Sequence, residues 1–115
     1  MTRKDELAAI VGAENVSTTE SVLLKYSRDH SLIPPGRPES VVWPTSSEQV
    51  GEVLKWANVE NVPVIPVSSK EHFNGGTVPR QGGVVMDLAK MNRILEIDKD
   101  LKKARFEAGV TWGQL

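Results

Sequence analysis

The chain has 115 residues, enough for one domain with a hydrophobic core. Its net charge of −1 argues against a dedicated nucleic-acid or acidic-membrane binder, because such proteins carry a strong positive surface. The absence of cysteine excludes disulfides, thiolate metal sites and a cysteine nucleophile. No apolar stretch approaches the length of a membrane span. The N-terminus also lacks the apolar core of a signal peptide, because Asp5 and Glu6 interrupt it. A cytoplasmic protein is therefore the default expectation.

Residues 1–37 predict an N-terminal helical arm. Thr2 is a cap for a helix over residues 2–11, and the threonine pair at 18–19 is a cap for a second, shorter helix. The following stretch, residues 32–38, contains three prolines and a glycine and so cannot form regular structure. We take this stretch as the boundary between the arm and a compact unit over residues 38–115.

The compact unit opens with a strand, a helix and a second strand. Residues 41–43 predict the first strand, which Pro44 stops. Thr45 and Glu48 then have the spacing of a capping box. The helix that follows carries one apolar stripe, formed by Val50, Val53, Leu54 and Ala57. Residues 62–67 complete a βαβ unit, so the two strands are expected to be parallel with a right-handed crossover.

The remainder of the unit is predicted to be β structure, which makes the fold class α+β. Residues 84–88 predict another buried strand, and residues 94–98 and 103–108 predict a half-exposed antiparallel hairpin. Thr111 and Gln114 form a second capping box that has no helix behind it. We therefore expect a fragment that ends at a subdomain boundary, with an exposed apolar patch that promotes self-association.

The long polar loop between residues 62–67 and 84–88 is the candidate binding segment, because loops held by buried strands commonly present binding groups. Serine hydroxyls and Lys70 can donate hydrogen bonds to an anion, and Gly75 and Gly76 permit close backbone approach. The glycines are equally well explained as simple turn residues, so the residues alone leave both interpretations open.

Other chemistry has little support in the sequence. The two histidines, His30 and His72, lie far apart and lack further ligands at convergent spacing, so we predict no metal site. Ser68 or Ser69 with His72 lacks the glycine-flanked elbow of a serine nucleophile. The glycine motifs of P-loop and dinucleotide-binding folds are also absent.

Four blocks of the sequence resemble a known family. They are the strand and helix start at 39–50, the strand and loop at 64–79, GGVVMDLAKMNRI at 82–94, and EAGVTW at 107–112. In this order they resemble the first half of the FAD-binding domain of the vanillyl-alcohol-oxidase type. These FAD-linked oxidases include the flavin-linked glycolate and D-lactate dehydrogenases.

The resemblance implies that FAD places its pyrophosphate on the loop. The expected contacts are Ser68, Ser69, Lys70, Glu71, His72, Phe73, Asn74 and Gly75. Pro44 and residues 110–111 are expected to line the adenosine side. The resemblance also implies that this fold is the first of two FAD-binding subdomains, and that a second subdomain and a cap domain complete the protein.

The implied function is that of an FAD-dependent oxidoreductase acting on a small alcohol or a 2-hydroxy acid. The fragment alone is expected to be inactive, and no catalytic residue is assigned, because the groups that contact substrate lie outside this sequence. Substrate and electron acceptor remain open.

The loop itself departs from the family pattern. The family has a glycine-rich run where this chain has Ser69, Lys70 and Glu71. Glu71 would repel a diphosphate, whereas Lys70 and the serines would donate to it. The alternative is therefore a non-catalytic module that binds another anion or a protein partner. His72 adds the hypothesis of covalently bound FAD, because some family members bond the flavin through a histidine in this loop.

Overall fold

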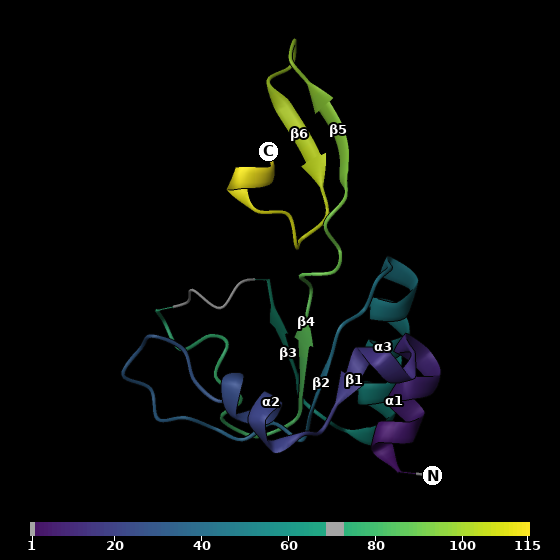
Figure 1. Ribbon diagram of the computed structural model, residues 1–115, viewed down its shortest axis with the longest axis vertical. Helices are drawn as coiled ribbons and strands as arrows, with labels where there is room; N and C mark the ends of the chain where they lie inside the picture. The colour runs from purple at the N-terminus through teal and green to yellow at the C-terminus, as the bar shows by residue number, and fades with distance from the viewer. Residues whose placement is uncertain (1, 69–72) are drawn as a thin grey trace.

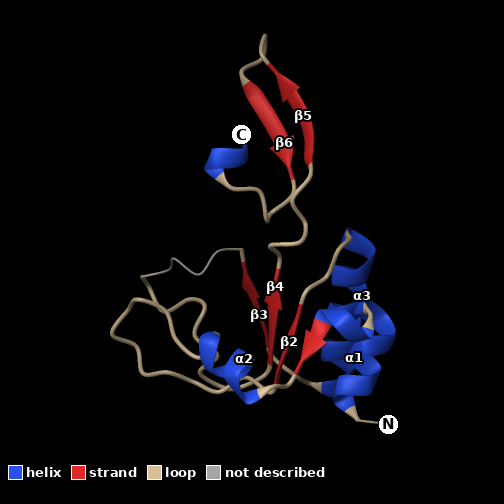
Figure 2. Ribbon diagram, viewed as in Figure 1, coloured by secondary structure: helices blue, strands red, loops and turns tan. Residues whose placement is uncertain are grey.

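The computed structural model describes residues 2–68 and 73–115 (Figure 1). A body of helices around a sheet carries a projecting β-hairpin (Figure 2). In chain order the elements, with η for a 3₁₀ helix, are α1 (Arg3–Val11), η1 (Ala13–Asn15), β1 (Val16–Ser17), α2 (Glu20–Lys25), β2 (Ser40–Val42), α3 (Ser47–Glu60), β3 (Val64–Val67), β4 (Val84–Asp87), β5 (Ile94–Asp98), β6 (Lys103–Phe106) and η2 (Trp112–Gln114).

The sheet of the body has the strand order β1-β2-β4-β3. β4 is parallel to both of its neighbours, and Val85 pairs with Val41 on one side and with Ile65 on the other. All residues of β2 and β4 are buried, as expected for parallel strands covered on both faces. The predicted βαβ unit is confirmed, because α3 joins the parallel strands β2 and β3. β4 lies between them, an order that the sequence did not reveal.

Helices cover the sheet on two faces (Figure 1). On the face of α1 and α3, one core cluster consists of Leu7, Val11, Val16, Val42, Val53, Val84 and Met86. On the face of α2, a second cluster consists of Leu23, Tyr26, Val41, Val67 and Val85. Neighbouring residues of β2 and β4 alternate between the clusters, because successive side chains of a strand point to opposite faces. Burying each valine stabilises the fold by roughly 1.5–3 kcal/mol.

The N-terminal residues belong to the same core. Leu7 and Val11 of α1 contribute to the first cluster, and β1 adds an antiparallel strand beside β2. The Trp56 indole N–H also donates to Glu6 Oε2 at 2.8 Å, which links α3 to α1. The two predicted helices of the arm are confirmed, and β1 is an addition that the sequence pattern did not indicate. Residues before and after position 37 share this core. The predicted domain boundary near residue 37 stays a prediction.

The start of α3 differs from the prediction by one residue. Ser46 is the N-cap, and its side-chain oxygen accepts from Gln49 N at 3.2 Å. Thr45 N donates to the Gln49 side chain at 2.8 Å, so Gln49 rather than Glu48 reaches back. Thr45 and Ser46 are both good caps, and the structure selects the second of them.

The predicted hairpin of β5 and β6 is confirmed as antiparallel, but the expected half-burial is wrong. Every residue of β6 is exposed, and so are Ile94, Leu95 and Ile97 of β5. The alternating pattern therefore indicates an apolar face that nothing among the described residues covers. Within residues 2–68 and 73–115, every helix is too short or too polar to span a lipid bilayer.

Replacing Leu7 by alanine tests whether α1 is part of the core. Leu7 has no exposed surface, so Leu7→Ala should lower the free energy of unfolding by about 2–5 kcal/mol. Leu24→Ala is the matched control, because the Leu24 side chain is 63% exposed and its loss should change stability by less than about 0.5 kcal/mol. Urea denaturation followed by tryptophan fluorescence measures both. Equal effects of the two substitutions would show that α1 is not part of the core.

Candidate FAD site

A cleft of about 570 Å³ lies at the carboxyl ends of β3 and β4. Three parts of the chain that are distant in sequence form it: the residue after β3, the exit of β4, and the segment that returns from the hairpin. Its lining residues are Ser68, Asp87, Ala89, Asn92, Gly109, Thr111 and Gln114. Ligands of open sheets with parallel strands bind outside the carboxyl ends of the strands, so this is the expected position for a cofactor.

Gly109 brings the returning segment against the exit of β4. Its N–H donates to Met91 O at 2.8 Å. A β-carbon at this position would lie 2.2 Å from Leu88 O and 2.7 Å from Met91 O, which no real side chain allows. Glycine is therefore required for the walls of the cleft to approach this closely.

A charged pair fixes the base of the hairpin beside the cleft. Glu107 Oε1 accepts from Arg93 N at 2.9 Å and from Arg93 Nε at 3.0 Å, and Glu107 Oε2 accepts from the Arg93 guanidinium at 3.2 Å. These hydrogen bonds lower the pKa of Glu107 and raise the pKa of Arg93. The bidentate geometry holds the two ends of the hairpin in register where they enter the body.

Asp87 forms the floor of the cleft, and both of its carboxylate oxygens are bonded. The Tyr26 hydroxyl donates to Oδ2, and Ala89 N donates to Oδ1 at 2.9 Å. Burial, followed by the hydrogen bond to Asp87, raises the pKa of Tyr26. The Tyr26 ring meets Trp43 edge-on, with 6.4 Å between the ring centroids. Asp87 therefore orients the backbone at the exit of β4 and is not a free base.

The predicted site residues divide into three groups. Ser68 lines the cleft, as does Thr111 from the expected adenosine side. Phe73, Asn74 and Gly75 lie beside another part of the chain, where Gly75 N donates to Asp29 Oδ2 at 2.7 Å. The remaining predicted contacts, Ser69, Lys70, Glu71 and His72, lie outside the described residues.

Two other expectations concern the adenosine side. Pro44 is fully buried, and neither it nor Val110 is among the residues that line the cleft. Their predicted contact with adenosine therefore gains no support. In contrast, Asp87, Ala89, Asn92 and Gly109 line the cleft without having been named as site residues. The signal for Asp87 was present in the sequence as an acidic residue at the end of an apolar strand.

The lining suits part of a nucleotide cofactor. The Ser68 hydroxyl and the Asn92 amide supply neutral hydrogen-bonding groups. The carboxylate of Asp87 is nearly buried and bonded at both oxygens, which limits its repulsion of an anion. The lack of a side chain at Gly109 lets the returning segment pack against the backbone carbonyl groups that follow β4. Among the described residues, no group of three His, Cys, Asp or Glu side chains is placed to hold a metal ion.

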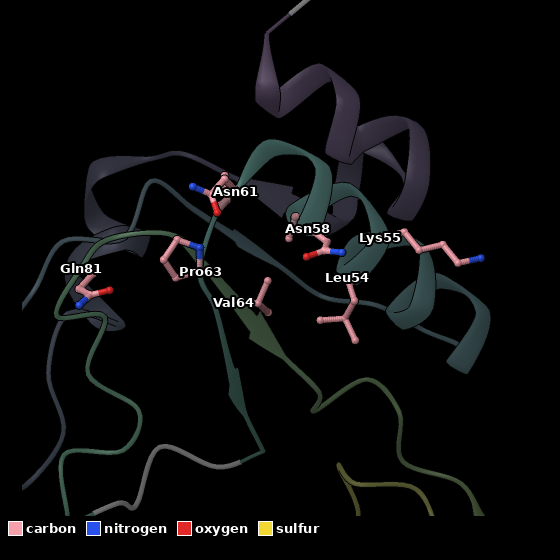
Figure 3. Close-up of a pocket in the computed structure, with 9 residues that line it drawn as sticks. Leu54, Lys55, Asn58, Asn61, Pro63, Val64 and Gln81 are labelled. Atoms are coloured by element: carbon pink, nitrogen blue, oxygen red, sulfur yellow. The ribbon is translucent and has the colours of Figure 1, made fainter.

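A second hollow, of about 770 Å³, lies between the end of α3 and the start of β3 (Figure 3). Asn58, Asn61 and Gln81 surround it with amide groups, together with Leu54, Pro63 and Val64. It is larger than the first cleft, but it lies at the amino end of β3. We therefore place the candidate site at the carboxyl-end cleft.

Comparison with known proteins shows to which family this chain belongs. The sequence profile described as FAD binding domain matches residues 38–115, which is more than half of the chain. The chain belongs to the FAD binding domain family. The family confirms FAD as the expected cofactor and agrees with the predicted resemblance.

Individual relatives agree with the family match. The glycolate oxidase subunit GlcD of Bacillus subtilis is 32% identical over 107 residues, which cover 93% of this chain and 23% of that protein. The D-lactate dehydrogenase of Archaeoglobus fulgidus is 35% identical over 113 residues, which cover 96% of this chain and 24% of that protein. The chain thus spans about a quarter of the length of these relatives.

The fold agrees with a solved structure. p-Cresol methylhydroxylase with substrate bound superposes with a TM-score of 0.84 at 30% sequence identity, over 96% of this chain and 22% of that one. This likeness confirms the predicted fold, a mixed sheet with helices and an antiparallel hairpin. The comparisons support the oxidoreductase interpretation and give no support to the alternative of a non-catalytic module.

The Tyr26–Asp87 bond predicts a pH dependence of stability. Because the pKa of Tyr26 is raised in the folded state, the unfolded chain loses this proton first, near pH 10. The stabilisation is therefore complete below about pH 10 and decreases as the pH rises above it. Tyr26 is the only tyrosine, so its ultraviolet titration reports it directly. We expect a midpoint above the ordinary tyrosine value in the folded protein and near that value in denaturant.

Tyr26→Phe is the matched variant, since it removes only the hydroxyl group. At neutral pH it should lower the free energy of unfolding by about 1–3 kcal/mol, because the buried Asp87 carboxylate loses a donor. It should also reduce the decline of stability in alkali. A folded-state titration of Tyr26 at the ordinary value would contradict the buried hydrogen bond.

Proposed function

We propose that this chain is the first FAD-binding subdomain of an oxidoreductase that takes a hydride from a small alcohol or a 2-hydroxy acid. The single observation that carries the proposal is the family match over residues 38–115, which include every residue that lines the carboxyl-end cleft. The substrate class follows the names of relatives, which include a glycolate oxidase subunit and a D-lactate dehydrogenase.

The residues of the cleft bind and orient the cofactor in this proposal. The Ser68 hydroxyl donates to the pyrophosphate, and the Asn92 amide and Thr111 line the same cleft. Tyr26 and Ala89 N each donate to one oxygen of Asp87, which reduces the repulsion between its charge and the phosphates. FAD, when bound, supplies the hydride acceptor, and the protein provides position and electrostatics.

The negative charge of the pyrophosphate needs compensation that the described lining does not provide. Among the described residues that line the cleft there is no lysine or arginine. Lys70, which lies outside the described residues, is the predicted contact that carries a positive charge. We therefore assign charge compensation to Lys70, and hydrogen bonding to Ser68 and its neighbours.

The rest of the protein is proposed to complete the active site. The relatives are about four times as long as this chain, which leaves length for the second FAD-binding subdomain and the cap domain. The exposed apolar side chains of the hairpin are a suitable surface for that subdomain, or for self-association when it is absent. Cytoplasmic location stays a prediction.

The proposal predicts flavin binding and flavin reduction. The protein that carries this chain should bind FAD, and anaerobic addition of glycolate or D-lactate should bleach the flavin absorbance. Ser68→Ala should weaken FAD binding by about ten- to a hundredfold, the size of one hydrogen bond to a charged group. Ser21→Ala, an exposed serine of α2, is the matched control and should bind as the wild type does.

The outcomes separate the parts of the proposal. Absence of saturable FAD binding would contradict the function altogether. Binding without reduction by any small alcohol or 2-hydroxy acid would contradict only the substrate class.

Acid denaturation tests the hypothesis of covalently bound FAD. Flavin that stays with the denatured wild type, but not with the denatured His72→Ala variant, would support a link through His72.

A further inference from the structure

The segment 29–33, which lies between α2 and β2, contacts the end of the candidate cofactor loop. Figure 1 shows this part of the chain beside the segment that follows the loop, on the side of α2. Asp29 Oδ2 accepts from Gly75 N at 2.7 Å, and the rings of His30 and Phe73 lie 5.3 Å apart. The two segments are thus joined by a carboxylate–amide bond and by a ring contact.

The geometry of Asp29 is itself fixed. Its other carboxylate oxygen, Oδ1, accepts from Ser31 N at 2.8 Å, which closes a local turn. The Ser31 hydroxyl in turn accepts from Ile33 N at 3.2 Å. With both oxygens engaged in backbone hydrogen bonds, the Asp29 carboxylate has one defined orientation. It acts as a preformed acceptor for the loop rather than as a mobile charge.

The backbone conformation of Gly75 and its lack of a side chain allow this contact. Its φ of +79° is a conformation that favours glycine. A β-carbon there would lie 2.5 Å from Ile33 Cγ1, so the segment packs directly on the glycine backbone. Gly75 O then accepts from Val78 N at 3.2 Å, and Val78 is buried. The described end of the loop is therefore fixed at two points, by the bond of Gly75 to Asp29 and by the bond of Gly75 to the buried Val78.

We propose that Asp29 is a positioning residue for cofactor binding, because its carboxylate holds the Gly75 amide and orders the end of the loop before FAD arrives. This inference rests on the proposed function. The Gly75 N–H is already bonded, so Gly75 serves the cofactor indirectly, through the path of the loop. Order that exists before binding reduces the conformational entropy lost on binding and so raises affinity.

The experiment also distinguishes positioning by Asp29 from competition between Asp29 and the cofactor. A carboxylate that occupies a backbone amide is the same kind of acceptor as a phosphate oxygen. If the pyrophosphate needs the Gly75 amide, Asp29 competes with it, and removing the carboxylate strengthens binding.

The test compares Asp29→Ala and Asp29→Asn with Asp98→Ala. Asp98 is the matched control, since its carboxylate also accepts from a backbone N–H, that of Leu101 at 2.9 Å, but in the hairpin turn. Amide hydrogen exchange of Gly75 is measured without FAD, and FAD affinity is measured separately by titration. Asp29→Ala should accelerate Gly75 exchange and weaken FAD binding, each on the order of tenfold. Asp98→Ala should change neither.

Asp29→Asn should restore most of both properties, because an amide oxygen can still accept from Gly75 N. Unchanged Gly75 exchange in Asp29→Ala would overturn the positioning role, and so would tighter FAD binding in either variant. If the wild type binds no FAD, the proposed function fails, and with it the cofactor role of Asp29. The exchange measurement then still decides whether Asp29 orders the loop.

Discussion

The position of β4 between β2 and β3 is the constraint on which the rest of the structure depends. All three strands are parallel, so the chain must leave β3 at the carboxyl end of the sheet and return to the amino end before it can form β4. The connection between the strands therefore begins beside the exit of β4. This places Ser68 next to Asp87, because Val67 pairs with Asp87 in the parallel ladder and Leu88 N donates to Val67 O at 2.8 Å.

The cleft exists because the chain comes back to this edge a second time. After β4 the hairpin extends away from the body, and its return brings Gly109 and Thr111 against the carboxyl ends of the strands. The close backbone approach at Gly109 and the Arg93–Glu107 pair determine where this return lies. A cofactor site assembled from three passes of the chain is thus fixed mainly by backbone contacts and one charged pair.

Sequence patterns revealed the features that depend on nearby residues. The apolar stripe predicted α3, uninterrupted apolar residues predicted β4, and alternation predicted the hairpin. The cap of α3 was missed by one position, because adjacent residues offer equivalent hydrogen bonds. β1 has only two residues, and its strand character comes from pairing with β2 rather than from a local pattern.

The features that the sequence did not reveal join residues that are far apart. The insertion of β4 between β2 and β3 is a choice of neighbours that no local pattern encodes. The bond from Tyr26 to Asp87 spans 61 positions, and that from Gly75 to Asp29 spans 46. Of the predicted site residues, Ser68 was found in the cleft because it directly follows a strand. Asp87 stands as an acidic residue at the end of an apolar strand, but its bond to Tyr26 and the close approach at Gly109 arise from tertiary contacts that the sequence did not reveal.

The central claim is that FAD binds at the carboxyl ends of β3 and β4. Backbone amide chemical shifts of this chain, recorded during an FAD titration, test it most directly. The largest shifts should occur at Ser68, Ala89, Asn92, Gly109 and Thr111, which line the cleft. Shifts concentrated at Asn58, Asn61 and Gln81, around the hollow at the amino end of β3, would contradict the claim.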